Sequence, residues 1–316
     1  LLGLAHGEHR HSAHRFEWGR QRFEAWATGV AARNGFDVAF EAIGPIHAWH
    51  GSPTQMAVFR RRTSGGARVP VSPGPAQMTR SNLEILAYEP TELGPLCLRR
   101  RELLSSPGTV VTEITLDHEF LMSSLYTASE QALARVALEM HAGTGLDVLV
   151  GGLGLGYTAD AVLQSSRVRH VLALELLPQV VDWMNDDLLP LSPVLEEDDR
   201  FEVRTTDAHA HLLGPAAERW DLILIDIDHA PQDRLGDADD TFYTVDGLHR
   251  ARRHLAPGGV LGVWSWAESS PFARAMEEVF DTVRVEPVTF FNRMVDEERT
   301  DWLFFGTDHP PAADGA

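Results

Sequence analysis

The sequence predicts an α/β protein in which a small antiparallel β-meander is followed by a doubly wound, mostly parallel sheet. The clearest observation is the apolar run Val148–Val150, which breaks into a segment with Gly151, Gly152, Gly154 and Gly156 and then resumes with helical spacing. Further apolar runs then alternate with helical segments. This alternation is typical of parallel strands joined by helices on both faces of a sheet.

The glycine-rich segment predicts a tight turn between a strand and a helix. Glycine is needed where the backbone adopts positive φ, and bare backbone allows a nucleotide to approach the start of the helix. Glu175 ends the next apolar run, nineteen positions after Gly156, where a second strand would place a carboxylate to bind ribose hydroxyls. Glycine turns also join strands to helices without a ligand, so the segment alone does not establish a site.

Two further predicted strands also end in acidic residues. The run from Phe201 to Thr206 ends at Asp207, and the run from Trp220 to Ile225 ends at Asp226. Because ligands of open parallel sheets bind at the carboxyl ends of the strands, these ends predict a binding cleft.

Shorter runs before the glycine turn predict the β-meander. Residues Leu83–Tyr88, Leu96–Arg101 and Thr109–Leu116 alternate or are apolar between Pro- and Gly-containing turns. A helix is expected from about Ser123 to His141, and Pro257-Gly258 precedes a fifth strand of the main sheet.

Composition narrows the class of protein. No apolar run of the 316 residues approaches the roughly 20 residues that cross a bilayer, and no leader peptide is visible, so a cytoplasmic protein without a membrane partner is expected. The single Cys97 excludes an intramolecular disulfide and a multi-thiolate zinc site. The chain has no lysine, which excludes Schiff-base and lysine general-base chemistry.

Charge is distributed unevenly along the chain. Residues 1–77 have nine Arg and five acidic residues, whereas residues 78–316 have 18 Arg and 41 acidic residues. The acidic part is unsuited to binding a phosphate backbone, so no nucleic-acid partner is expected for it, while a negatively charged cleft would attract polyamines or other cations. Runs such as Glu196-Glu197-Asp198-Asp199 are also typical of solvated loops.

Pattern and composition divide the chain into four segments. Residues 1–62 contain a helical pattern and two candidate strands, residues 63–77 are typical of a linker, residues 78–122 contain the β-meander, and residues 123–316 contain the main sheet. The helix in the first segment is expected to end at Asn34-Gly35.

The first segment resembles the last part of the RNA 3′-terminal ribose 2′-O-methyltransferases. The resemblance rests on His11-Ser12-Ala13-His14-Arg15-Phe16-Glu17-Trp18, on Ile43-Gly44-Pro45 and on Pro53–Phe59. It implies that His11 or His14 helps to hold a metal in an intact enzyme. Because the family's glutamate-bearing segment is missing here, solvated histidines without a metal are expected, and RNA binding by this remnant is a further alternative.

Most of residues 83–305 resembles the spermidine synthase family, a branch of the class I S-adenosylmethionine-dependent transferases with a Rossmann-like sheet. VLVGGLGLGYT, at Val148–Thr158, stands where that family has a VLVIGGGDGGT-like turn, and Leu174-Glu175 stands where it has the ribose-binding glutamate. Asp207-Ala208 matches an adenine-contacting Asp-Gly, and Asp226-Ile227-Asp228-His229 matches an Asp-Ser-x-Asp catalytic loop.

The resemblance implies a co-substrate, a fold and a site. S-adenosylmethionine or its decarboxylated form would be the co-substrate, no metal would be needed, the acceptor would be a small molecule, and a homodimer would form. The cofactor-binding residues implied are Gly152, Gly154, Gly156, Glu175, Asp207 and Ala208.

Two departures from the family pattern fall at positions that bind the substrates in that family. The family holds the donor's terminal ammonium with the Asp of the glycine turn, where this chain has Leu155, and a Tyr-His-Glu segment of the polyamine groove is replaced by Met122-Ser123-Ser124. Loss of a charge-assisted hydrogen bond costs on the order of 1.5 to 3 kcal/mol. These changes favour ordinary S-adenosylmethionine and therefore methyl transfer to a small amine or hydroxyl acceptor.

The loop after the fourth strand carries the candidate catalytic residues. A sulfonium is already a good leaving group, so the protein must align an acceptor and take its proton. Asp226 is expected to do both, Asp228 to point the same way in an extended chain, and His229 to act as a neutral base near pH 7. Asp228 as a turn residue and His229 as a solvated loop residue are the alternatives.

Other residues near the strand ends have less specific interpretations. His209 and His211 are expected on a helix surface rather than at a metal, and Trp264 and Trp266 either stack on a ligand or pack in the core. Three functions therefore remain open: a methyltransferase, a polyamine aminopropyltransferase (spermidine synthase) that uses the decarboxylated donor, and a nucleoside-binding protein without chemistry.

Overall fold

The computed structural model describes residues 20–43, 54–61, 83–103, 106–117, 119–227, 241–292 and 297–308. The chain forms two compact units. One comprises Leu1–Ser81 with Leu103–Thr109 and Arg293–Glu297, and the other comprises Asn82–Glu102, Val110–Asn292 and Glu298–Ala316. The small sheet and the main sheet therefore belong to the same unit.

The first unit contains a helix and an antiparallel strand pair, α1 (Arg20–Asn34), β1 (Phe36–Ile43) and β2 (Thr54–Arg61). The helix ends at Gly35, whose φ of +71° suits glycine, as the sequence predicts. Phe23 on the helix contacts Phe40 on β1 edge-on, with ring centroids 6.0 Å apart. His11 and His14 lie outside the described residues.

The second unit begins with a four-stranded antiparallel sheet in the order β3-β4-β5-β6. Its strands are β3 (Leu83–Thr91), β4 (Gly94–Glu102), β5 (Val110–Leu116) and β6 (Glu119–Ser123). The sequence predicts the first three, whereas β6 was not expected. It forms because residues before the helix pair with β5, with Met122 opposite Ile114.

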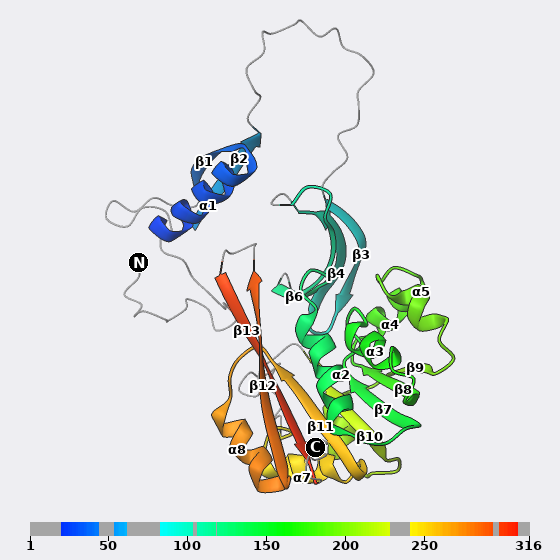
Figure 1. Cartoon of the computed structure of the whole chain (residues 1–316). Coiled ribbons are helices and arrows are strands. Elements are labelled where there is room, and N and C mark those ends of the chain that lie inside the picture. The colour runs from blue at the N-terminus through cyan, green and yellow to red at the C-terminus, as the bar shows by residue number, and fades with distance from the viewer. Residues whose placement is uncertain are drawn as a thin grey trace, which may run out of the picture. The chain divides into compact units, whose positions relative to one another are not determined.

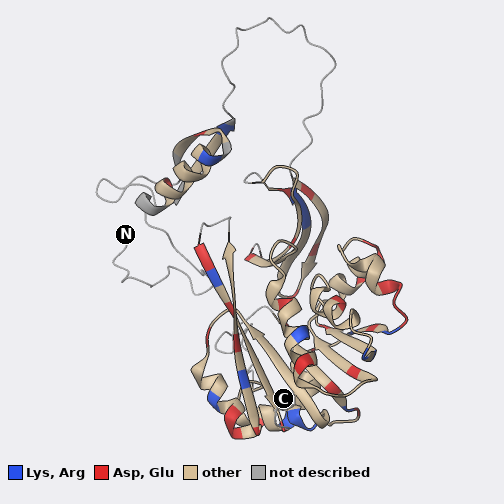
Figure 2. Ribbon diagram, in the orientation of Figure 1, with Lys and Arg blue, Asp and Glu red and all other residues tan. Residues whose placement is uncertain are grey.

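A buried carboxylate joins β4 to β5. Glu113 is 1% exposed and accepts hydrogen bonds from Arg99 Nε at 2.9 Å and Arg101 Nη2 at 2.7 Å. Two guanidinium groups on the neighbouring strand thus compensate one buried charge, which would otherwise be costly. Figure 2 shows these basic residues as the blue stretch of β4.

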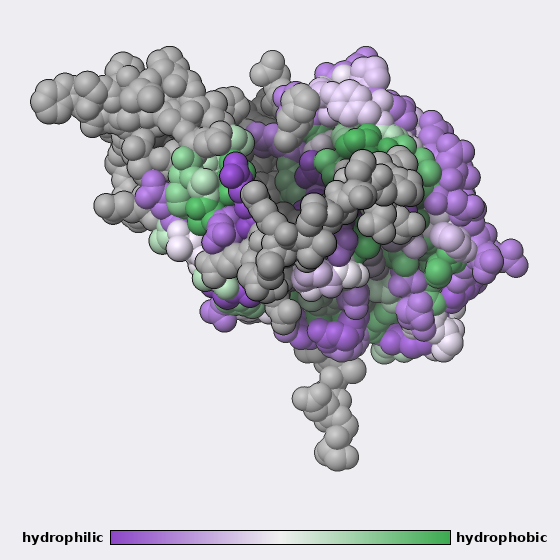
Figure 3. Space-filling model, turned by 90° about the horizontal axis from the view of Figure 1, so that it is seen from above, coloured by the Kyte–Doolittle hydropathy of each residue, from purple (hydrophilic) through white to green (hydrophobic). Residues whose placement is uncertain are grey.

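The outer strand of the small sheet exposes apolar side chains. Leu83, Ile85 and Tyr88 of β3 are each more than two fifths exposed. On the face seen in Figure 3, hydrophobic and hydrophilic residues are intermixed. The inner strands differ, because Leu96, Leu98 and Ile114 are fully buried and join the core of the main sheet.

The main sheet has seven strands in the order β12-β13-β11-β10-β7-β8-β9 (Figure 1). The strands are β7 (Leu146–Gly151), β8 (Val168–Glu175), β9 (Phe201–Thr205), β10 (Trp220–Ile225), β11 (Leu255–Ser265), β12 (Thr282–Asn292) and β13 (Glu297–Thr307). Strands β11, β10, β7, β8 and β9 are parallel, and β13 is antiparallel to β11. The predicted mostly parallel α/β sheet is confirmed, and the two last strands extend it beyond the prediction.

Helices cover both faces of this sheet. One apolar cluster packs α2 (Ala128–Met140), α3 (Tyr157–Leu163), α4 (Pro178–Asn185) and α5 (Ser192–Glu196) against one face. A second cluster packs α6 (Ala208–Leu213), α7 (Val245–Arg252) and α8 (Ser270–Val279) against the other. Helix α2 begins later than predicted because β6 occupies the preceding residues. No helix within the described ranges combines the length and apolarity that crossing a membrane requires.

The strand order reverses direction at β7. The chain runs outward from β7 through β8 to β9 and then returns to the other side of β7 to form β10 and β11. In open parallel sheets such a reversal opens a crevice at the carboxyl ends of the two central strands, where ligands bind. The ends of β7 and β10, at Gly151 and Ile225, therefore mark the expected position of a site.

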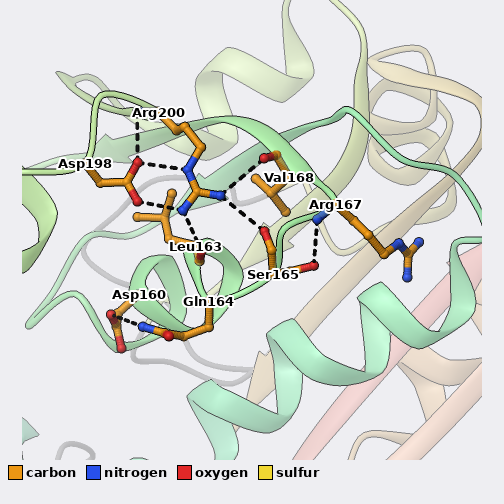
Figure 4. Close-up of polar contacts among 8 residues, drawn as sticks. All are labelled: Asp160, Leu163, Gln164, Ser165, Arg167, Val168, Asp198 and Arg200. Carbon is orange, nitrogen blue, oxygen red and sulfur yellow. Dashed lines mark hydrogen bonds and ion pairs between the residues drawn. The ribbon is translucent and has the colours of Figure 1, made fainter.

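Arg200, directly before β9, binds the C-terminal end of α3 and the start of β8. Its guanidinium donates to the carbonyl oxygens of Leu163, Ser165 and Val168 and forms an ion pair with Asp198 (Figure 4). The last carbonyl groups of a helix have no partner within the helix, and the Arg200 side chain supplies one for the Leu163 carbonyl at the end of α3.

We expect Arg200→Ala to lower the free energy of unfolding by about 2 kcal/mol, because charged hydrogen bonds to three carbonyl groups are lost. Urea denaturation measures the change. The matched control is Arg204→Ala, which removes an ion pair to Glu202 between two roughly half-exposed side chains and should change stability by less than about 0.5 kcal/mol. Equal effects of the two substitutions would contradict the role of Arg200.

Candidate functional site

The glycine turn lies directly against the end of β10. Gly152 has a φ of +98°, and a Cβ atom there would lie 2.2 Å from the carbonyl oxygen of Asp226. The Asp226 amide in turn donates to the Gly151 carbonyl at 2.8 Å. Glycine is therefore required at position 152 both for its backbone conformation and for this close approach.

Apolar side chains cover the rest of the turn. Gly154 and Gly156 also have positive φ, and Cβ atoms there would lie 2.9 Å from Met122 Sδ and 2.7 Å from Leu195 Cδ1. Leu155, which the sequence places where the family binds the donor's ammonium, is 4% exposed and packs in the apolar core.

Glu175 stabilises the glycine turn through its carboxylate. It is 7% exposed, and Oε2 accepts from the amides of Leu153 at 3.0 Å and Gly154 at 3.3 Å. Oε1 accepts from the Leu177 amide at 2.9 Å. Burial raises the pKa of Glu175 above its ordinary value, and the backbone donors oppose that rise. Backbone amides thus occupy most of the roughly four acceptor sites of this carboxylate.

Asp207 and Ala208 lie at the start of α6. Asp207 caps this helix, its Oδ1 accepting from the Ala210 amide at 3.0 Å, and its side chain is exposed. Ala208 is 4% exposed and packs beside Gly151. The helix cap accounts for an acidic residue at position 207 by itself. Adenine binding by this pair remains a prediction.

Asp226 presents its carboxylate to the first turn of α3. The Thr158 hydroxyl donates to Asp226 Oδ2 at 2.5 Å. Burial raises the pKa of Asp226 to about 6, and the negative charge of Asp301 contributes to the rise. The other two candidate catalytic residues, Asp228 and His229, lie outside the described residues.

Two carboxylates that the sequence analysis did not single out accompany Asp226. The Ser129 hydroxyl lies 2.9 Å from Glu130 Oε2 and 2.7 Å from Asp301 Oδ2. Burial, followed by the charge of Asp226, raises the pKa of Glu130 to about 8. Only the tertiary structure brings α2, β10 and β13 together here, although the Ser-Glu pair at the start of a helix is a visible local signal.

Of the histidines and tryptophans near the strand ends, His209 takes a different position from the one expected. His209 was predicted on a helix surface, which is wrong: it is 9% exposed and stacks on Phe242, with ring centroids 4.4 Å apart. His211 is partly exposed and lies 5.4 Å from the ring of His254. Trp264 packs against the core, and Trp266 is 37% exposed. In the part of the chain that the structure describes, no three His, Cys, Asp or Glu residues are arranged to hold a metal ion.

The second unit thus has a Rossmann-like α/β architecture, with a glycine turn and an acidic strand end at the reversal of the sheet. Its small antiparallel sheet and Rossmann-like sheet together form the spermidine synthase fold. The spermidine synthase from Thermotoga maritima matches with a TM-score of 0.57 and 18% identity over 73% of this chain and 76% of that one. A spermidine synthase in complex with the transition-state analogue AdoDATO matches with a TM-score of 0.56 and 17% identity over 72% and 74%.

Sequence comparison agrees with this fold. A stretch of 162 residues is 32% identical to the polyamine aminopropyltransferase of Oceanobacillus iheyensis, covering 51% of this chain and 30% of that protein. The chain thus matches less than a third of the relative's length. No protein-family profile matches the chain. The predicted resemblance to spermidine synthases is confirmed, while that of residues 1–60 to RNA 2′-O-methyltransferases stays a prediction.

Proposed function

We propose that this chain is a spermidine synthase-like transferase that moves an aminopropyl group from decarboxylated S-adenosylmethionine to a small amine of the polyamine class. The observation that carries the proposal is the group of Asp226, Glu130 and Asp301 where the strand order reverses. A negatively charged site suits an acceptor and a donor that both carry ammonium groups.

The donor would lie across the ends of β7, β8 and β9. The glycine turn would face its sulfonium, Glu175 would bind the ribose, and Asp207 with Ala208 would contact the adenine. Support comes from Glu175, whose carboxylate accepts from two amides of the glycine turn and from the Leu177 amide. Asp207 follows β9, the parallel neighbour of β8, so it lies at the same carboxyl edge of the sheet as Glu175.

Asp226 would orient the acceptor amine and take its proton. In the transfer step one proton of the acceptor's ammonium passes to the Asp226 carboxylate, the neutral amine nitrogen forms a bond to the carbon next to sulfur, and the carbon–sulfur bond breaks with its electron pair on sulfur. A pKa of about 6 leaves this carboxylate ionised near pH 7 yet more basic than an ordinary aspartate. Asp228 and His229 follow directly and remain candidates to assist.

Methyl transfer, the principal function predicted from the sequence, is not confirmed. It rested on Leu155, which packs in the core, and on the replacement of the family's Tyr-His-Glu segment by Met122-Ser123-Ser124. The relatives named above are a polyamine aminopropyltransferase and spermidine synthases, so they support the alternative. Methyl transfer remains the second candidate because position 155 still lacks the carboxylate that would hold the decarboxylated donor's ammonium.

A side-by-side titration of the purified protein with S-adenosylmethionine and its decarboxylated form tests the proposal. We expect the decarboxylated donor to bind at least about tenfold more tightly, since the acidic site attracts an ammonium and repels a carboxylate. Adding 1,4-diaminobutane should then yield an aminopropylated product, detected by mass spectrometry. Product formation only with S-adenosylmethionine would favour methyl transfer, and binding without product across a panel of amines would indicate a nucleoside-binding protein.

A further inference from the structure

One hydroxyl group lies between two carboxylates in the site. Ser129 Oγ is 2.7 Å from Asp301 Oδ2 and 2.9 Å from Glu130 Oε2, both hydrogen-bond distances. A serine hydroxyl has a single proton and donates one hydrogen bond. If both carboxylates were ionised, one of the two contacts would place oxygen lone pairs against each other. One further proton, on Glu130 or on Asp301, makes both contacts full hydrogen bonds.

The surroundings of Glu130 assign this proton to it. The charged groups that act on Glu130 are Asp226 and Asp301, and both are negative. Among the other described groups, α3 contributes Tyr157 and Asp160. Burial and the charges of Glu130 and Asp160 raise the pKa of Tyr157. Strand β12 contributes Arg284 and Glu286, which pair with each other, and β11 has no titratable residue. Burial among like charges favours the neutral acid, in agreement with a pKa of about 8.

We propose that Glu130 holds a proton in the free protein, in the chain Glu130 Oε2–H to Ser129 Oγ–H to Asp301 Oδ2, and releases it when the ammonium group of the acceptor binds beside Asp226. The inference rests on the proposed function for the identity of the acceptor. The exchange balances in charge, because a bound cation replaces a proton that returns to solvent. Acceptor binding therefore depends on pH through Glu130, a residue that does not take the amine proton in the transfer step.

Calorimetry with 1,4-diaminobutane, in two buffers of different ionisation enthalpy at pH 7, measures the proton directly. We expect about one proton to be released per diamine bound in the wild type and close to none in Glu130→Gln. Glutamine has the shape of the protonated acid and can donate to Ser129, so this variant should fold. The control is Glu139→Gln on the same helix, which removes a half-exposed carboxylate paired with Arg135 and should release the wild-type number of protons. Equal proton release by wild type and Glu130→Gln would overturn the linkage.

Infrared spectroscopy tests the stored proton without any acceptor. The wild type at pH 7 should show a carboxylic-acid carbonyl band that is missing in Glu130→Gln and retained in Glu139→Gln. Absence of this band in the wild type would overturn the inference even if the diamine binds and reacts. Presence of the band together with no diamine binding would instead overturn the proposed function and, with it, the linkage to an acceptor.

The pH dependence of stability also tests whether Glu130 holds a proton in the folded protein. The Glu130 carboxyl group has an ordinary pKa of 4.5, expected when unfolded, and one of about 8 when folded. Between these values the folded state binds more protons than the unfolded state, so stability should fall as pH rises. The free energy of unfolding of the wild type, relative to Glu130→Gln, should therefore decrease from pH 4.5 to pH 8. A flat difference would contradict a buried neutral Glu130.

Discussion

Asp226→Asn is expected to lower the rate of group transfer by about two to four orders of magnitude, because general-base catalysis typically contributes that much. Asparagine preserves the shape of the side chain at the end of β10 but cannot accept the amine proton. Binding of the decarboxylated donor should change little in comparison. The wild-type rate should also rise with pH through about 6, where Asp226 becomes ionised, and the variant should lose this dependence.

Single-turnover kinetics separate this chemical step from binding. The control is Asp246→Asn on α7, which removes an exposed carboxylate paired with Arg250 and should leave the rate unchanged. If Asp226→Asn keeps more than about a tenth of the wild-type rate, another group takes the proton, and Asp228 or His229 would be the next candidates.

Gly152→Ala is expected to be the most damaging substitution for the fold, with a loss of about 4 kcal/mol in the free energy of unfolding. The added Cβ would lie 2.2 Å from the Asp226 carbonyl oxygen at a φ of +98°. Backbone strain and overpacking each cost on the order of 1 to 3 kcal/mol. Urea denaturation measures the loss, and titration should show that the decarboxylated donor no longer binds.

Gly145→Ala separates backbone strain from the steric clash as causes of the loss at Gly152. Gly145 has a φ of +72° but no atom within 4 Å of an added Cβ, so the substitution introduces backbone strain without a clash. We expect a loss of about 1 to 2 kcal/mol there. Equal losses at the two positions would mean that the contact between the glycine turn and Asp226 contributes nothing.

Several features of the fold could be predicted because they depend on neighbours along the chain. The parallel strands are visible as apolar runs, and glycine marks both the turn at Gly152 and the helix end at Asn34-Gly35. Strands β6, β12 and β13 were missed, because their pairing depends on partners elsewhere in the sheets. The surface position expected for His209 was wrong for the same reason, since Phe242 of a distant segment covers its ring.

The candidate site also has residues that the sequence could identify and contacts that it could not. Its strand-end residues, Gly152, Glu175, Asp207 and Asp226, could be identified because each follows an apolar run. Their partners could not. Whether Glu175 faces solvent or the backbone amides of the turn, and whether Leu155 faces a ligand or the core, depends on packing that no local pattern records.

The sequence by itself determined the α/β class, the succession of the parallel strands and the acidic residues at their ends, because periodicity and turn chemistry act over a few residues. Only the tertiary structure decided that Ser129 and Glu130 on α2 meet Asp301 on β13 near Asp226, which directly follows β10. Desolvation and charge repulsion depend on distance in space, so the proton that we assign to Glu130 exists only once these three elements are packed together.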